Sequence, residues 1–147
     1  MDSSLVYLVQ TDTTVGFSSS NDEKLSDVKQ RPRSKKILHT VDSFKTLQKH
    51  TRIPKKFKKQ VRRSSFTTFI YPNQKSFRVI KKDKNFYDFI HKFGVLYSTS
   101  ANKTSKSFEK EFAISNSDVV VEDKNNFFES SASKIIKLTK TLKKHIR

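Results

Sequence analysis

The sequence predicts a single α/β (α+β) domain, built as a twisted, open, mixed sheet with flanking helices. Short apolar runs rich in β-branched residues alternate along the chain with segments whose apolar residues recur every three to four positions. The chain has 147 residues, of which 33% are hydrophobic, and this suits one domain with a modest core. Because it contains only two glycines and three prolines, no Gly- or Pro-rich linker marks a boundary, and we expect residues 1–147 to form one domain.

Charge and composition limit the classes of function. The 31 basic and 14 acidic residues give a formal charge of +17, which attracts phosphate-rich partners without identifying one. The absence of cysteine excludes disulfides, thiolate metal ligands and thiol nucleophiles, and the four histidines show no metal-ligand spacing. No signal peptide or run of transmembrane length is present, so we expect a cytoplasmic protein without membrane contact, and with no metal held by the protein itself.

The first predicted strand is the apolar run Leu5–Val9, and a hydroxyl-rich segment follows it directly. Continuous apolar runs are typical of strands covered on both faces, so we expect this strand at the centre of the sheet. Thr11 and Thr13 then offer hydroxyl groups in a loop, and Gly16 allows close approach of backbone or ligand. The alternative is a simple turn in which Asp12 caps a helix.

A short helix and a basic segment come next. Residues 18–22 are polar and predict a loop, and residues 23–28 predict the helix. Pro32 ends this helix and holds Arg31 extended, so the cations of residues 29–36 spread outward. Such a fan suits phosphate or carboxylate groups, and a solvated basic surface is the alternative.

The next part of the chain predicts a strand at Ile37–Val41 and two helices. The first helix is capped by Asp42 or Ser43. The second begins near Pro54 and carries an apolar residue every four positions. Its other faces form either a polyanion-facing surface or a solvated one, and they carry Lys55, Lys56, Lys58, Lys59, Arg62 and Arg63.

A hairpin and the clearest helix follow. Phe66–Tyr71 and Ser76–Ile80 are rich in β-formers and are separated by the turn signal Pro72-Asn73, which predicts antiparallel pairing. Arg78 lies inside the second run, where it either faces solvent or requires a carboxylate or a bound ligand as its anionic partner. Residues 83–93 have apolar side chains at i, i+3, i+4 and i+7, the pattern of an amphipathic helix.

The segment after this helix is the clearest candidate for a site. Residues 93–97 predict a strand that ends in the polar loop Ser98–Asn102, and loops at strand ends commonly hold the sites of α/β proteins. The alternative is a turn that caps the next helix. The remaining predicted elements are a short helix, two strands and a basic tail, at residues 108–112, 118–121, 134–138 and 140–147.

Three of these polar segments resemble motifs of the YrdC/YciO family of threonylcarbamoyl-adenylate synthases. Residues 10–16, Gln-Thr-Asp-Thr-Thr-Val-Gly, are similar to the family's Pro-Thr-Asp-Thr-x-x-Gly, and residues 29–35 keep its Lys-x-Arg-Pro-x-x-Lys spacing. Residues 98–102 carry its Ser-Thr-Ser-Ala-Asn signature, with weaker similarities at residues 76–80 and 132–136. Several of the family's loop-shaping Pro and Gly residues are replaced.

The resemblance implies a YrdC-like nucleotidyltransferase that makes threonylcarbamoyl-AMP and pyrophosphate from L-threonine, bicarbonate and ATP. It implies Mg²⁺ with the ATP, and as partners tRNA and the machinery that transfers the threonylcarbamoyl group to tRNA adenosine. Lys29 and Arg31 would be catalytic, because they would neutralise the reacting carboxylate and phosphate. The implied nucleotide-binding residues are Ser98, Ser100, Asn102, Arg78 and Ser133. The implied threonine-binding residues are Thr11, Thr13 and Lys35.

A second hypothesis belongs to another class of function. The charge of +17 and the replaced Pro and Gly residues also suit a catalytically degenerate YrdC-like protein that binds double-stranded or structured RNA through a concave basic surface. For the nucleotide pocket, the sharpest geometric expectation is that Ser100 and Asn102 both point into a basic cleft near Lys29 and Arg31.

Overall fold

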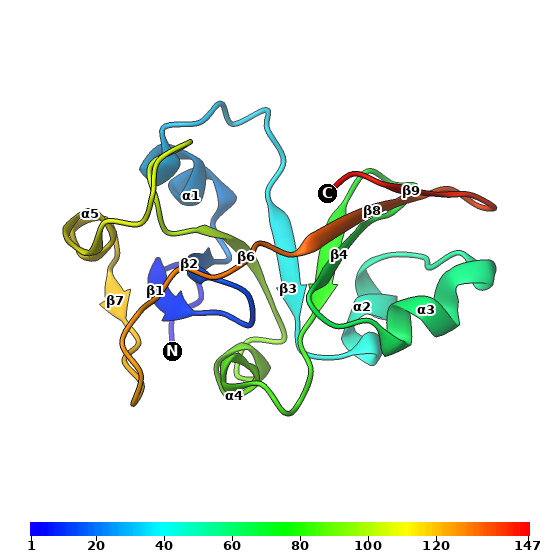
Figure 1. Ribbon diagram of the computed structural model, residues 1–147, viewed down its shortest axis with the longest axis horizontal. Helices are drawn as coiled ribbons and strands as arrows, with labels where there is room; N and C mark the ends of the chain where they lie inside the picture. Colours follow the sequence, from blue (N-terminus) through cyan, green and yellow to red (C-terminus); the bar gives the residue numbers. More distant parts are fainter.

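The computed structural model describes residues 1–147 and contains nine strands and five α-helices (Figure 1). The strands are β1 Tyr7–Gln10, β2 Val15–Ser19, β3 Leu38–Val41, β4 Thr67–Ile70, β5 Ser76–Val79, β6 Val95–Ser100, β7 Val119–Val120, β8 Lys134–Leu138 and β9 Lys143–His145. The helices are α1 Asp22–Lys29, α2 Phe44–His50, the 3-10 turn η1 Lys55–Phe57, α3 Lys58–Arg63, α4 Asn85–His91 and α5 Lys110–Ser115. No helix is long and apolar enough to cross a lipid bilayer.

All nine strands join one open sheet in the order β7-β1-β2-β6-β3-β5-β4-β8-β9. The β1–β7, β3–β5 and β4–β8 pairs are parallel and the other neighbours are antiparallel, so the sheet is mixed. The predicted fold class is therefore confirmed, as is the antiparallel hairpin of β4 and β5.

Two layers of helices cover the sheet, and β1 shows how. Leu8 packs in a cluster with side chains of α1 and α5, whereas its neighbours Tyr7 and Val9 pack in a different cluster with α4. Successive side chains of a strand point to opposite faces, so α4 lies on one face and α1 and α5 lie on the other. The strand is buried on both faces as predicted, but it lies second from the edge of the sheet and not at its centre.

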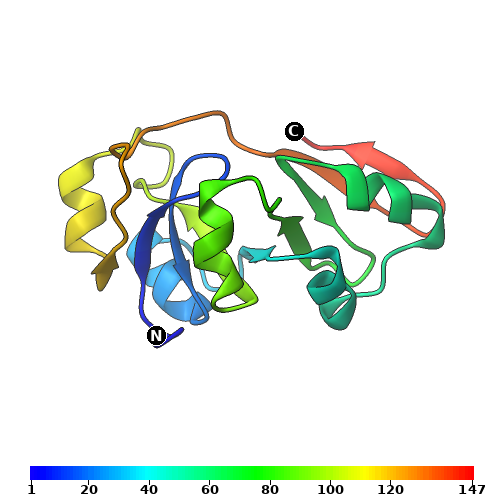
Figure 2. The same cartoon turned by 90° about the horizontal axis from the view of Figure 1, so that it is seen from below.

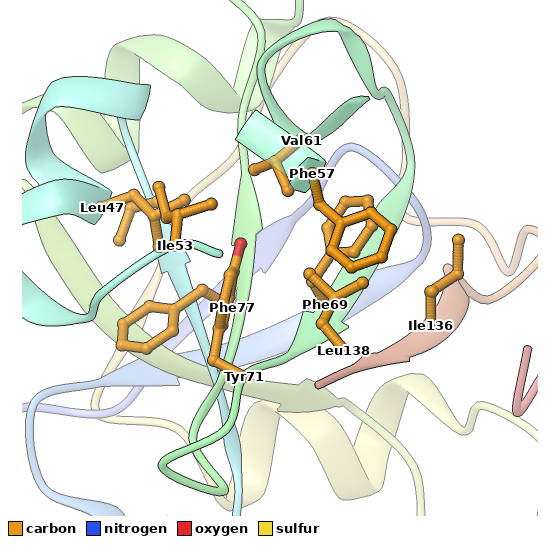
Figure 3. Close-up of a cluster of buried hydrophobic side chains, with 10 residues drawn as sticks. Leu47, Ile53, Phe57, Val61, Phe69, Tyr71, Phe77, Ile136 and Leu138 are labelled. Carbon is orange, nitrogen blue, oxygen red and sulfur yellow. The ribbon is translucent and has the colours of Figure 1, made fainter. Parts of the chain in front are cut away.

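A third cluster fills the other end of the sheet, between β4, β5, β8 and the helices α2 and α3 (Figure 3). The predicted four-residue repeat supplies three of its members, Ile53, Phe57 and Val61, which are 4%, 5% and 1% exposed. Leu138 from β8 completes the wall opposite α3. Burying one such side chain stabilises the fold by about 1.5–3 kcal/mol.

Helix boundaries follow local capping signals. Asn21 caps α1 by accepting a hydrogen bond from the backbone N–H of Lys24 at 3.1 Å, and Ser43 caps α2 in the same way through Thr46 at 3.0 Å. At the other end of α1, Gln30 takes the left-handed conformation with φ of 53°, two residues before the proline that the sequence predicts as the stop.

Three sequence-based expectations are wrong. Residues 18 and 19 belong to β2, and Ser98–Ser100 belong to β6, because both segments are hydrogen-bonded within the sheet despite their polar side chains. Residues 143–145 of the basic tail form β9, which pairs with β8. In each case a partner strand overrides the local composition, which favours a loop.

Candidate functional site

A polar cleft of about 400 Å³ opens where the ends of several strands meet one face of the sheet. Its walls come from the β1–β2 turn, the basic segment after α1, strands β2, β4, β5 and β6, and the chain entering β8. Seven of the residues predicted for the catalytic, nucleotide and threonine sites line it: Thr11, Thr13, Arg31, Arg78, Ser98, Ser100 and Ser133.

Three other predicted residues do not line this cleft. Asn102 lines a smaller cavity of about 140 Å³ that shares Ser100 with the cleft. Lys35 lines a separate cavity of about 200 Å³ beside His39. Lys29 lines neither of these, and its ammonium group lies against the end of β6.

The ammonium group of Lys29 is surrounded by oxygen atoms of Ser100 and Asn102. It donates to the Ser100 carbonyl at 3.0 Å, to the Asn102 side-chain oxygen at 2.9 Å, to the Ser100 hydroxyl at 3.4 Å and to the Asn102 carbonyl. Burial, together with the nearby guanidinium of Arg31, lowers the pKa of Lys29 to about 8. Through these hydrogen bonds, Lys29 fixes the end of β6 and the residues that follow it.

The expectation for Ser100 and Asn102 therefore holds only in part. Both are near Lys29, and Ser100 faces the cleft together with Arg31. Asn102 uses its side-chain oxygen for Lys29 and its amide for the carbonyl of Lys106, so its polar atoms are already engaged.

The first hydroxyl-rich segment forms a tight turn between β1 and β2. The Thr11 hydroxyl donates to the Thr14 carbonyl at 2.5 Å and accepts from the Thr13 backbone N–H at 3.2 Å. These bonds fix the two threonine side chains, 3.3 Å apart at their hydroxyls, on the wall of the cleft.

Gly16 lies inside β2, and close packing explains the absence of a side chain. A Cβ atom here would lie 2.9 Å from the backbone carbonyl of Thr99 and 3.1 Å from the methyl group of Thr11. A larger residue would therefore push β2 away from β6 and from the turn that carries Thr11.

Arg78 is buried, and its anionic partner is a carboxylate from the other side of the cleft. Its Nε and Nη2 atoms both lie 3.0 Å from an oxygen of Asp12, and the two side chains are 4% and 3% exposed. The sequence predicts that a buried Arg78 needs an anionic partner, and Asp12 is that partner. The alternative in which Asp12 caps a helix is wrong, because the strand β2 follows the turn.

The guanidinium group of Arg31 faces the cleft with part of its hydrogen-bonding capacity unused. Its Nη2 reaches the Lys36 carbonyl only at 3.5 Å, and its buried Nε has no hydrogen-bond partner. A buried donor without a partner costs free energy, so an anion in the cleft would bind here favourably.

Sequence reasoning missed Arg147 at the cleft. Its Nε donates to the Ser133 carbonyl at 2.9 Å and its Nη2 lies 3.4 Å from the Ser133 hydroxyl, which also contacts the Thr68 hydroxyl at 2.8 Å. The signal was the basic composition of the last eight residues, but only the pairing of β9 with β8 directs this arginine back to the cleft.

The six cations predicted to face RNA are exposed, but they do not belong to the concave cleft. Phe57 and Val61 of this segment pack against the same sheet face as Phe69 of β4. The neighbours of Phe69 along the strand, Thr68 and Ile70, line the cleft on the opposite face. The structure therefore separates the predicted RNA surface from the predicted nucleotide site.

No group of three or more His, Asp or Glu side chains converges to hold a metal ion. The one carboxylate next to the cleft, that of Asp12, is bound by Arg78.

Comparison with known proteins gives similarity in fold. No protein-family model matches the sequence, and no curated protein sequence matches it. Among solved structures, the MTH1692 protein from Methanobacterium thermoautotrophicum matches with a TM-score of 0.71 and 20% identity, over 98% of this chain and 80% of that one. Sua5 of P. abyssi, solved in complex with L-threonine, matches with a TM-score of 0.82 and 14% identity, over 98% of this chain.

This match covers only 50% of the Sua5 chain, so the present chain spans about half the length of Sua5. Full-length HypF in its phosphate- and nucleotide-bound form matches with a TM-score of 0.74 and 11% identity, over 98% of this chain and 27% of that one. At these identities the comparisons show that this protein has the fold shared by MTH1692 and Sua5, the fold that the sequence motifs led us to expect.

Proposed function

We propose that this protein is a threonylcarbamoyl-AMP synthase-like nucleotidyltransferase that uses L-threonine, bicarbonate and ATP. One observation carries the proposal: the Thr11 turn, the Arg31 segment and the Ser98–Ser100 strand, far apart in sequence, border one cleft. A cleft of about 400 Å³ falls within the range of small-molecule sites. The Sua5 structure with the same fold holds L-threonine, which supports that substrate here.

The proposed chemistry needs positioning and charge neutralisation more than a side-chain nucleophile. The threonine amine attacks the bicarbonate carbon, and loss of water gives a carbamate. A carbamate oxygen then forms a bond to the α-phosphorus of ATP, while the bond from that phosphorus to the bridging oxygen breaks and pyrophosphate leaves. In-line placement of the two reactants supplies much of the rate.

The cleft residues have distinct roles in this proposal. Arg31, with its free Nε, neutralises the reacting phosphate, and Arg147 adds a second cation on the opposite wall. Ser98 and Ser100 hydrogen-bond the nucleotide, and the paired hydroxyls of Thr11 and Thr13 hold the amino acid. Lys29 acts as a positioning residue, because it fixes Ser100 through the end of β6.

Mg²⁺ enters this proposal with ATP. The hydroxyl groups of the cleft can bind a hydrated ion only weakly, so phosphate oxygens would be its main ligands, and its chemistry there would be neutralisation of phosphate charge. The residues present thus suit a metal that arrives with the nucleotide.

The decisive assay measures pyrophosphate release by the folded protein. We expect release that requires both L-threonine and bicarbonate and that falls more than about 100-fold in Arg31→Ala, which removes a charge acting on the reacting phosphate. Arg33→Ala is the matched control, since Arg33 is exposed and pairs with Glu23 and Asp27 away from the cleft; its rate should stay within about 2-fold of wild type. Folded protein without threonine-dependent release would refute the proposal and favour the degenerate RNA-binding alternative.

The product would be a substrate for a transferase that moves the threonylcarbamoyl group to an adenosine of tRNA. We propose the cytoplasm as the place of this reaction, since it contains both ATP and tRNA. An acyl adenylate hydrolyses in water, so we also propose direct transfer between the two proteins.

A further inference from the structure

The positive charge of this protein is concentrated in one half of the fold. Residues 43–82 and 130–147 contain 19 basic residues and no Asp or Glu, and we call them the acid-free half. The other 89 residues carry 12 basic and 14 acidic residues, and we call them the charge-balanced half. Parallel pairing of β4 with β8 joins the two acid-free segments. In Figure 2 they form one end of the molecule, with the teal and blue-green helices α2 and α3 and the red C-terminal strand.

A groove of about 1000 Å³ lies in the acid-free half, more than twice the volume of the cleft. The link from α2 to η1, the β4–β5 turn and the β8–β9 turn form its walls. Four of its nine lining residues are cations, and none is an apolar side chain apart from the two prolines. The cations are Arg52, Lys55, Lys56 and Lys140.

None of these four cations pairs with a carboxylate. The ion pairs of the molecule all use carboxylates of the charge-balanced half, and only that of Arg78 extends into the acid-free half. Lys56 instead donates to the Thr141 carbonyl at 2.9 Å, and Lys143 contacts the Gln60 side chain at 3.3 Å. The first bond joins two walls of the groove and the second joins β9 to α3 beside it, and both leave the positive charge uncompensated.

The groove continues into a wider basic surface. The exposed cations of α3 and the exposed lysines of β9 extend it, and the two elements are neighbours, because Lys143 of β9 contacts Gln60 of α3. A small anion would use only part of such a surface. A long polyanion with regularly spaced charges matches its extent.

The lining favours nucleic acid over a membrane or an acidic peptide. Surface helices that bind membranes insert an apolar face, but the apolar residues of η1 and α3, Phe57 and Val61, are buried in the core. Leu142 is exposed alone at the β8–β9 turn. The hydroxyl of Thr141 adds a hydrogen-bonding group suited to ribose 2′-hydroxyls, which duplex DNA lacks, whereas the side chain of Asn73 is already bonded to Thr51 and to the backbone of Lys75.

We propose that the groove lined by Arg52, Lys55, Lys56 and Lys140 is a docking site for the backbone of structured RNA, separate from the cleft. The proposal does not rest on the synthase reaction, because the groove lies away from the cleft and shares no residue with it.

The test compares two variants with equal charge. The groove variant changes the four cations to Gln. The control variant changes four exposed lysines of the charge-balanced half to Gln, Lys24, Lys92, Lys110 and Lys124. Fluorescence anisotropy with a labelled 20-base-pair RNA hairpin, from 50 to 300 mM KCl, should show about 100-fold weaker binding and a salt slope reduced by about 3 in the groove variant. The control should stay within about 3-fold of wild type.

A second measurement needs no substitution. Acetylation of the wild-type protein with and without the RNA, read by mass spectrometry, should show protection of Lys55, Lys56 and Lys140 but not of Lys110. Equal loss of binding in both variants, no RNA binding, or equal protection of all lysines would overturn the proposal. Tighter binding of a DNA duplex of the same length, or groove-dependent binding to phosphatidylserine vesicles without RNA binding, would overturn the assignment to RNA.

Discussion

The charge-balanced half and the acid-free half share one sheet but use their polar groups differently. In the charge-balanced half, carboxylates pair with cations and buried hydroxyls line strand ends, as with Asp27 beside Arg33 and Ser98 in β6. In the acid-free half, almost every cation is left to solvent. The cleft lies at the border between the halves, since it takes Thr11 and Arg31 from one half and Arg78 and Ser133 from the other. The proposed reaction therefore requires the two halves to be held together.

The largest expected effect comes from breaking the buried ion pair that joins the halves. Arg78→Met leaves the carboxylate of Asp12 buried without a partner, and we expect a loss of about 3–5 kcal/mol in the free energy of unfolding, measured by urea titration. Arg33→Met breaks the exposed pair with Asp27 and should cost less than about 1 kcal/mol. If the two variants lose equal stability, the pair is not a structural link.

Core truncations test whether the halves unfold together. Leu25→Ala and Leu138→Ala each remove a side chain that is at most 1% exposed, one from each half, and each should cost about 2–5 kcal/mol. Because β3 and β5 continue the sheet across the border, circular dichroism and tyrosine fluorescence should report one common transition in both variants. Two separated transitions would show that the halves are independent units.

The buried cation of the charge-balanced half should make stability depend on pH. Lys29 has a pKa of about 8 in the folded protein, below its ordinary value of 10.5, so between these values the unfolded chain binds a proton that the folded chain does not. Stability contributed by this group therefore rises with pH across that window and is constant below it.

Lys29→Met isolates this contribution. Relative to the variant, wild-type protein should gain on the order of 2 kcal/mol of unfolding free energy between pH 8 and 10.5, measured by urea titration at each pH. Parallel curves for the two proteins across this window would show that the ammonium of Lys29 is not destabilised by burial.

The smallest expected effect concerns surface charge. Lys59 in α3 and Lys110 in α5 are exposed residues in the first turn of short helices, one in each half, so the helix dipole acts on both alike. Lys59→Glu relieves repulsion among cations and should stabilise by about 0.5 kcal/mol, whereas Lys110→Glu adds a negative charge between Glu109 and Glu111 and should not stabilise. The melting temperatures of both variants are measured by thermal unfolding at 50 mM salt. Equal changes in melting temperature would contradict the expected difference between the two halves.

Much of the local structure could be predicted from the sequence, because its signals act over a few residues. The Ser43 cap, the apolar repeat that begins at Ile53 and the hairpin turn at Pro72-Asn73 all lie where the sequence predicts them. The extents of β2 and β6 and the existence of β9 could not be predicted, since a polar segment becomes a strand only when a partner strand satisfies its backbone.

The candidate site divides in the same way. The residue types of the three polar segments were evident in the sequence, and the structure brings most of them to one cleft. The contacts of individual side chains were not evident in the sequence. Asp12 pairs with Arg78, Lys29 binds the end of β6, and Arg147 donates to the carbonyl of Ser133. Each of these contacts joins positions more than ten residues apart, so no local pattern encodes it.

Most helices and the more apolar strands, the segments that carry hydroxyl groups and those that lack carboxylates are evident from the sequence alone, because these properties reside in single residues and their neighbours. That two acid-free segments, separated by 47 residues, form one basic half depends on the pairing of β4 with β8, a contact between distant parts of the chain. The tertiary structure also separates the cleft from the basic groove, because residues within β4 line the cleft, whereas the turns that follow β4 and β8 line the groove.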